Sequence, residues 1–334
     1  MNIKNIFFAA AAAMALTACS SDDEQSFVSQ FPEDGVMRFT TNLVDPTAAQ
    51  TRASITSNDL NQQGQQFQVK VVNNASATYS YFSNVQYNGT EWVPAPRMLW
   101  QNNTQAITVT AAYKQGKDFT DNEFVGGANL TVAADQSSQA NLNAQDLLTM
   151  PTKTISNPST ETTLLQGGKL VIIFYHALTK LDVTLELKDE FYALNLNTAN
   201  ITDVKISGTN LGYNFQPMTA TGNYGTVTPA ATPVAGDIQP MKGSYTDATA
   251  DSKHSTATYE SIIVPQTIAA GQLTVSFKIG TRSFSWTNTT TYTLEQGKQY
   301  TLPLTVGNDG VTAGSRAFTA SNWENGDSGN LVTE

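Results

Sequence analysis

The chain has 334 residues, of which only 14% are charged, and its formal net charge is −10 at pH 7. An acidic chain is a poor candidate for nucleic-acid binding, because that affinity depends on Lys and Arg side chains that neutralise phosphates. Cys19 is the only cysteine, so no disulfide can form within the chain and stability must come from core burial. The length is sufficient for about two domains.

The first 18 residues are typical of a secretory leader. Lys4 supplies one positive charge and residues 6–18 carry none, a run too short to cross a bilayer core of about 30 Å as a helix. Leu16-Thr17-Ala18-Cys19 then resembles the lipobox of bacterial lipoproteins, in which the cysteine is acylated and becomes the first mature residue. We therefore expect a signal peptide over residues 1–18 and a lipid on Cys19. The alternative is an ordinary signal followed by a buried free cysteine.

Residues 19–34 are predicted to form a short, flexible, acidic tether. Ser20-Ser21-Asp22-Asp23-Glu24 directly follows the cysteine, and such a run resembles the surface-export signal of lipoproteins from Gram-negative anaerobes. The expected location is therefore the outer membrane, as a surface-exposed lipoprotein. A tether that is merely solvated is the alternative.

After the tether, apolar and polar residues alternate with a period of two, which is the mark of half-buried β-strands. Turns containing glycine separate these segments, and only one short helix is expected, near residues 139–148. Many short strands without alternating helices predict an all-β protein built from sandwiches. The clearest strands are expected at residues 37–43, 67–71, 107–113, 181–187, 273–279 and 300–306.

The best candidate for a domain boundary is the Asn-, Pro- and Thr-rich stretch over residues 151–163, which Gly167-Gly168 follows. We expect an N-terminal β-sandwich domain over residues 35–165 and a C-terminal one over residues 166–334. Residues 216–258 are rich in Gly, Pro, Thr and Ala and have little periodicity, so we expect a long loop there.

No motif for catalysis or for metal or cofactor binding is evident. His176 and His254 are the only histidines, and neither has a second ligand at metal-binding spacing. Residues 314–316 lack the context of a nucleophile elbow, and residues 306–311 match a hairpin turn better than a calcium loop. We expect no cofactor, no metal site and no enzymatic activity. A hydrolase with a carboxylate pair stays open as an alternative, because the sequence does not fix the separation of carboxylates in space.

The tryptophans lie in or beside strand-like segments. A platform on which sugars stack is one interpretation, but packing in the core or between sheets is the commoner role of Trp in a sandwich. We therefore expect core positions for Trp92, Trp100, Trp286 and Trp323.

Five short stretches together resemble the fimbrillin family, the type V pilins and fimbrillin-like lipoproteins of Gram-negative anaerobes, and the resemblance extends from about residue 36 to residue 323. The most distinctive is L-V-I-I-F-Y-H-A-L-T-K-L, a hydrophobic strand followed by an H-A-L-x-K-L step. The others are T-R-A, D-L-L, E-S-I-I-V-P-Q-T and G-K-Q-Y-T-L. In chain order the five occupy residues 51–53, 146–148, 170–181, 260–267 and 297–302.

The resemblance implies two tandem transthyretin-like β-sandwich domains and a role as a fimbrial structural or accessory subunit. In family members that polymerise, an arginine-directed protease cuts behind the first strand, and a strand from a neighbouring subunit replaces it. The matching bond here lies between Arg52 and Ala53. Cleavage there would release the first strand, which carries Met37, Phe39 and Leu43.

The implied partners are other fimbrial subunits, joined by strand addition, the outer membrane through the lipid, and an adhesion target on host or bacterial cells. The family's donor strand comes from the C-terminus, and residues 315–334 alternate only weakly here. A poor donor would suit a tip, an anchor that keeps its lipid and its first strand, or a non-polymerising surface lipoprotein that binds glycans or host proteins. His176 is expected to be a packed, hydrogen-bonded interior residue.

Overall fold

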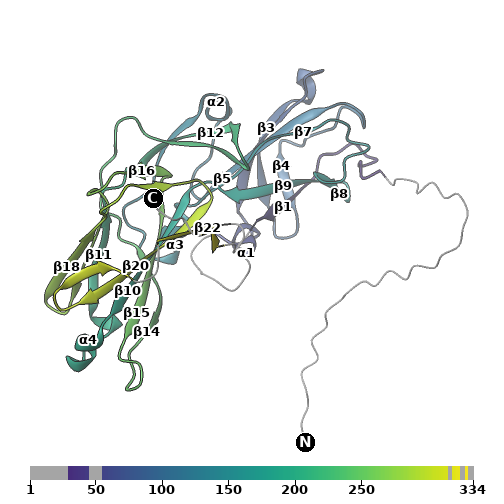
Figure 1. The fold of residues 1–334 in the computed structure, drawn as a ribbon. Helices are drawn as coiled ribbons and strands as arrows, with labels where there is room; N and C mark the ends of the chain where they lie inside the picture. The colour runs from purple at the N-terminus through teal and green to yellow at the C-terminus, as the bar shows by residue number, and fades with distance from the viewer. Residues whose placement is uncertain (1–28, 45–54, 315–317, 324–327, 330–334) are drawn as a thin grey trace, which may run out of the picture.

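The computed structural model describes residues 29–44, 55–314, 318–323 and 328–329. Strands dominate this part of the chain and the helices are short, so the all-β prediction is confirmed (Figure 1). In the described ranges no helix is both long and apolar enough to cross a membrane. Cys19, Arg52 and Ala53 lie outside the described residues.

The first sheet follows the order β1-β4-β3-β2-β5-β7-β9-β8, and an additional pairing of β1 with β9 closes the strands into a ring. Figure 1 shows these strands grouped at one end of the molecule. The strands are β1 (Phe39–Leu43), β2 (Gln66–Val72), β3 (Tyr81–Tyr87), β4 (Trp92–Ala95), β5 (Ile107–Lys114), β7 (Leu147–Ile155), β8 (Leu165–Gln166) and β9 (Lys169–His176).

Alternation along these strands sends one set of side chains into the interior of the ring. On β2, Phe67, Val69 and Val71 are fully buried. The Phe67 ring lies 5.4 Å, centroid to centroid, from that of Phe174 on β9, across the interior. The ring of strands therefore encloses a core of its own.

At the other end of the molecule, two further sheets face each other across a second core. The larger follows the order β14-β15-β10-β20-β22-β23, with β21 paired to β20, and the smaller follows β11-β17-β18. The larger comprises β10 (Thr179–Leu187), β14 (Met241–Thr246), β15 (Ser255–Ile263), β20 (Lys298–Gly307), β21 (Gly310–Ala313), β22 (Thr319–Asn322) and β23 (Ser328–Gly329). The smaller comprises β11 (Ile201–Ser207), β17 (Thr274–Ile279) and β18 (Arg282–Thr287).

Strand β12 (Gly212–Thr221) joins the two ends, because it pairs with β6 (Ala128–Thr131) on one side and with β13 (Tyr224–Pro229) on the other. A third buried cluster, which we call the seam, contains Phe124 and Leu147 from the first half and Phe215, Ile262 and Trp323 from the second. The remaining elements are α1 (Ser57–Leu60), η1 (Ala77–Tyr79), α2 (Asp121–Gly126), α3 (Gln139–Asn143), α4 (Asp189–Ala193), η2 (Thr198–Asn200), β16 (Gln266–Ile268) and β19 (Tyr292–Leu294).

Several sequence expectations differ from the structure in detail. Only one short helix was expected, whereas the described residues form four short α-helices. The helix expected at residues 139–148 stops at Asn143, because Leu147 already pairs with Lys114 in a sheet. The loop expected at residues 216–258 was wrong, since β13, β14 and the start of β15 lie there. The boundary expected at 165/166 falls inside β8, and β9 still belongs to the first sheet, so the chain changes sheets between His176 and Thr179. A division into two independent domains stays a prediction.

Candidate functional site

Strand β1 closes the first sheet into a ring. It lies parallel to β9, in a register that runs from Phe39 opposite Leu170 to Leu43 opposite Phe174. Its other edge meets β4 through one pair, Phe39 opposite Trp92. Most of its ladder contacts are therefore made with β9, and its absence would open the ring between β4 and β9.

The side chains of the first strand fill the ring's interior. Met37, just ahead of β1, Phe39 and Leu43 are each at most 5% exposed, and the Phe39 ring meets that of Phe67 edge-on at 6.3 Å. Burial of such a side chain stabilises a fold by roughly 1.5–3 kcal/mol, or about 5–9 kcal/mol for the three as an upper value. Departure of β1 would thus leave both unpaired backbone groups and an apolar groove.

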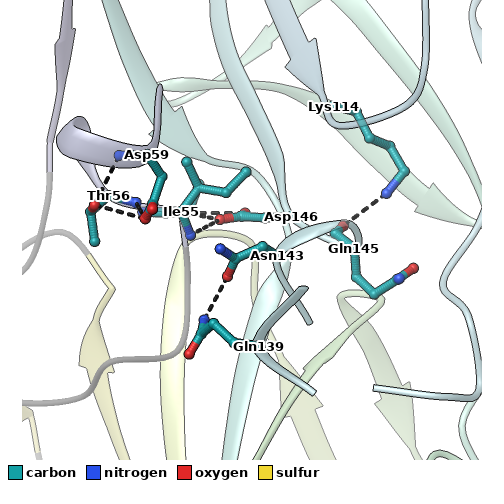
Figure 2. Close-up of polar contacts among 9 residues, drawn as sticks. Ile55, Thr56, Asp59, Lys114, Gln139, Asn143, Gln145 and Asp146 are labelled. Atoms are coloured by element: carbon teal, nitrogen blue, oxygen red, sulfur yellow. Dashed lines mark hydrogen bonds and ion pairs between the residues drawn. The ribbon is translucent and has the colours of Figure 1, made fainter. Parts of the chain in front are cut away.

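The chain that follows β1 is hydrogen-bonded to a buried carboxylate, that of Asp146. Val44 donates its N–H to the Phe174 carbonyl at 3.0 Å, and the next described residue is Ile55. The Ile55 N–H donates to Oδ2 of Asp146 at 3.2 Å, and Thr56 and Asp59 then form a capping box that begins α1 (Figure 2). Both sides of the segment that contains Arg52 are therefore fixed to the body of the protein.

Asp146 also binds His176, and both side chains are fully buried. The His176 Nδ1 lies 2.9 Å from Oδ2 and 3.1 Å from Oδ1 of Asp146. Asp146 lies between α3 and β7, and His176 ends β9, where Leu148 pairs with it. The D-L-L and H-A-L sequence motifs therefore meet at one contact, and the prediction that His176 is a packed, hydrogen-bonded interior residue is confirmed.

The C-terminal segment packs against His176 as well. The Trp323 ring stacks on His176 with 4.4 Å between ring centroids and 9° between planes, and its backbone N–H donates to the Gly297 carbonyl at 2.8 Å. The Phe318 ring stacks on Tyr292 at 4.4 Å. Between these two anchors, β22 pairs with β20 and with β23. The sequence analysis missed this docking, because Phe318 and Trp323 contact different clusters and so follow no single alternation.

The tryptophans and His254, the other candidates from the sequence, do not come together in a binding or catalytic site. All four tryptophans are buried, as predicted, and therefore present no exposed stacking platform. His254 lies at the surface, 3.2 Å from the Asp189 carboxylate through Nε2. Within the described ranges, no group of three or more His, Cys, Asp or Glu side chains is placed to hold a metal ion.

Comparisons with known proteins agree with this fold. A family model described as fimbrillin-like matches residues 51–323. A candidate cell adhesion protein from Bacteroides uniformis superposes with a TM-score of 0.55 at 16% identity, covering 87% of this chain and 99% of that one. One from Bacteroides ovatus gives 0.54 at 16% identity, covering 90% and 98%. A fimbrial protein from Bacteroides vulgatus gives 0.47 at 12% identity, covering 86% and 99%. The comparison with curated proteins found no match.

Proposed function

We propose, since the chain belongs to the fimbrillin-like family, that the protein is a structural or accessory subunit of surface fimbriae. In this proposal the lipid on Cys19 first holds the precursor on the outer membrane with its surface exposed. The observation that carries the proposal is the position of β1, which completes the first sheet between β9 and β4. A strand in that position can be exchanged for an equivalent one.

Assembly proceeds by donor-strand exchange after cleavage between Arg52 and Ala53. When β1 leaves, the edge of β9 from Leu170 to Phe174 loses its ladder partner. An incoming strand restores those hydrogen bonds and refills the space beside Phe67. Each subunit then contributes a groove at one place and a donor strand from another, and such contacts build a filament when they do not close into a ring.

The Ile55–Asp146 hydrogen bond supports cleavage in this segment rather than elsewhere. It anchors the chain three residues behind Arg52 to a buried carboxylate, while the other side of the segment is held only by the strand that is to be released. Cutting between these anchors frees β1 and leaves α1 and Asp146 in place. The candidate donor is the C-terminal segment from residue 315 onward.

Cleavage of purified protein with an arginine-specific protease tests the proposal. We expect the wild type to be cut after Arg52, to lose β1 and to form long polymers in light scattering. Arg52→Ala should keep β1 and stay monomeric, whereas Arg97→Ala, at an exposed position, should polymerise like the wild type. A wild-type protein that loses β1 and still remains monomeric would contradict donor-strand exchange.

The rival function is a non-polymerising surface lipoprotein that binds glycans or host proteins, and its argument for glycan binding depended on the tryptophans. Because Trp92 and Trp286 are at most 8% exposed, they are unavailable to stack on a sugar ring. The fimbrial subunit is therefore the function that the described residues support best.

A further inference from the structure

Three ionisable side chains are buried together on the face of β10 and β15 that is turned away from the second core. The side chains of Lys180, Asp182 and Glu260 are each at most 5% exposed. The Lys180 Nζ lies 2.9 Å from Oε2 of Glu260 and 3.7 Å from Oδ1 of Asp182. Asp182 lies directly opposite Glu260 in the antiparallel register, so the three groups occupy adjacent positions on two central strands.

The surroundings fix each of these groups. Gln299 on β20 donates its side-chain N–H to Oδ2 of Asp182 at 2.6 Å, which leaves Oδ1 directed toward the lysine. On β14, Gly243 makes room for Glu260, because a Cβ there would lie 2.4 Å from Oε1 of the glutamate. The amine and the Glu260 carboxyl are therefore held against each other in one arrangement.

Stability alone does not account for such a cluster. Taking an ion pair out of water costs several kcal/mol per ion, and well-packed apolar residues of similar volume often stabilise a fold more. Burial also raises the pKa of Asp182 to about 6, so this carboxyl holds a proton at a higher pH than an ordinary aspartate. A carboxyl whose pKa is raised toward neutral, beside an amine–carboxylate pair, can accept a proton and then donate one, as general acid–base catalysis requires.

We propose that Lys180 and Glu260 become joined by an intramolecular isopeptide bond, with Asp182 relaying the protons. A proton first passes from the ammonium to the Glu260 carboxylate, which gives a neutral amine and a neutral acid. The amine lone pair then attacks Cδ of Glu260 and forms the C–N bond. Asp182 accepts the excess proton from nitrogen and delivers a proton to the departing hydroxyl, the C–OH bond breaks, and one water leaves. No oxidant or other reactant is consumed.

The bond links β10 to β15, two neighbouring strands of the larger sheet, within a single folded chain. Its formation therefore does not depend on fimbrial assembly, and its test is separate from the test of the proposed function. A covalent link between central strands would hold the sheet together under pulling force.

Peptide mapping of the full-length protein, denatured and then digested with trypsin, tests the proposal independently of how the N-terminus is processed. We expect residues 170–188 and 254–278 to appear as one linked species, lighter than the sum of the two by one water, about 18 Da. Trypsin should not cut after Lys180 in this species. Separate peptides 170–180, 181–188 and 254–278 would overturn the proposal, and so would a link between Lys180 and Asp182 inside residues 170–188.

Three variants define the roles of the groups. Lys180→Arg keeps the positive charge and should show no link, while Lys278→Arg, at a lysine whose side chain is 48% exposed, should be linked as fully as the wild type. Asp182→Asn should be linked more slowly after refolding, by tenfold or more, because the relay is lost; linkage at the wild-type rate would overturn the role of Asp182. If Lys180→Arg fails to fold, the wild-type peptide map still decides whether the bond exists.

Discussion

The rings of His176 and Trp323 lie nearly parallel, 4.4 Å apart, although one ends β9 and the other directly follows β22. This stack joins the C-terminal segment to the seam. We expect Trp323→Ala to lower the free energy of unfolding by about 3–5 kcal/mol, because it empties a fully buried site. Chemical denaturation measures the loss, with Trp323→Phe as a control that keeps an aromatic ring and should lose less.

The same variant should loosen the C-terminal segment. Hydrogen exchange at residues 319–322 should speed up in Trp323→Ala while exchange in β2 changes little under native conditions. Unchanged exchange in β22 would mean that Phe318 and the β20 ladder hold this segment without Trp323.

A second prediction concerns the first strand. Phe39→Ala removes a ring that is 2% exposed, so we expect a loss of about 3–5 kcal/mol in the free energy of unfolding. Asn42→Ala, at an exposed position of the same strand, should change it by no more than about 0.5 kcal/mol. Similar urea midpoints for the two variants would show that β1 contributes little to the core.

A third prediction separates backbone strain from steric clash at two glycines with similar φ. Gly297 has φ +65° and a Cβ there would lie 1.9 Å from the Tyr224 hydroxyl, whereas Gly222 has φ +60° and open space around it. Gly222→Ala should cost about 1 kcal/mol from the left-handed conformation alone. Gly297→Ala should cost about 1–3 kcal/mol more, because Tyr224 must move. If Gly222→Ala and Gly297→Ala lower the melting temperature equally, the clash with Tyr224 does not contribute to the cost.

A fourth prediction concerns pH. Lys114 donates hydrogen bonds to the carbonyls of Ala144 and Gln145, and burial lowers its pKa from 10.5 to about 8. Between these pH values the unfolded chain binds more protons than the folded one, so stability rises with pH. From about pH 8 to pH 10 we expect a gain of about 1–3 kcal/mol from this group.

Denaturation series at several pH values, compared between variants, isolate this contribution. The gain should be absent in Lys114→Met and present in Lys253→Met, which alters an exposed lysine. Comparison between variants is needed because burial raises the pKa of Tyr213, whose ionisation in the unfolded chain opposes the gain above about pH 10. A wild-type slope in Lys114→Met would contradict the assignment.

Strand positions could be predicted from the sequence where one face is buried and the other is polar, as in β2 and β17. Exposed edge strands such as β14 could not be predicted in this way, because four of the six residues of β14 are exposed and the other two are half-buried, so the strand shows no apolar alternation. The parallel pairing of β1 with β9 joins segments far apart in the chain, and no local period specifies such a pairing.

The burial of the charges on β10 could not be predicted from the sequence either. Lys180 and Asp182 occupy the polar positions of an alternating strand, and alternation predicts that these face solvent. In the folded chain that face of β10 is covered, and both side chains are buried. Short motifs were more informative, because the histidine of H-A-L and the aspartate of D-L-L, 30 residues apart in the sequence, contact each other in the fold.

The most direct test of the central claim, that β1 is removed so that another strand can replace it, is mass spectrometry of the protein taken from the native cell surface. Our account predicts a mature N-terminus at Ala53, with residues 37–43 absent from the polymerised subunit. A lipidated N-terminus at Cys19, with the Phe39 strand still attached in assembled fimbriae, would contradict it.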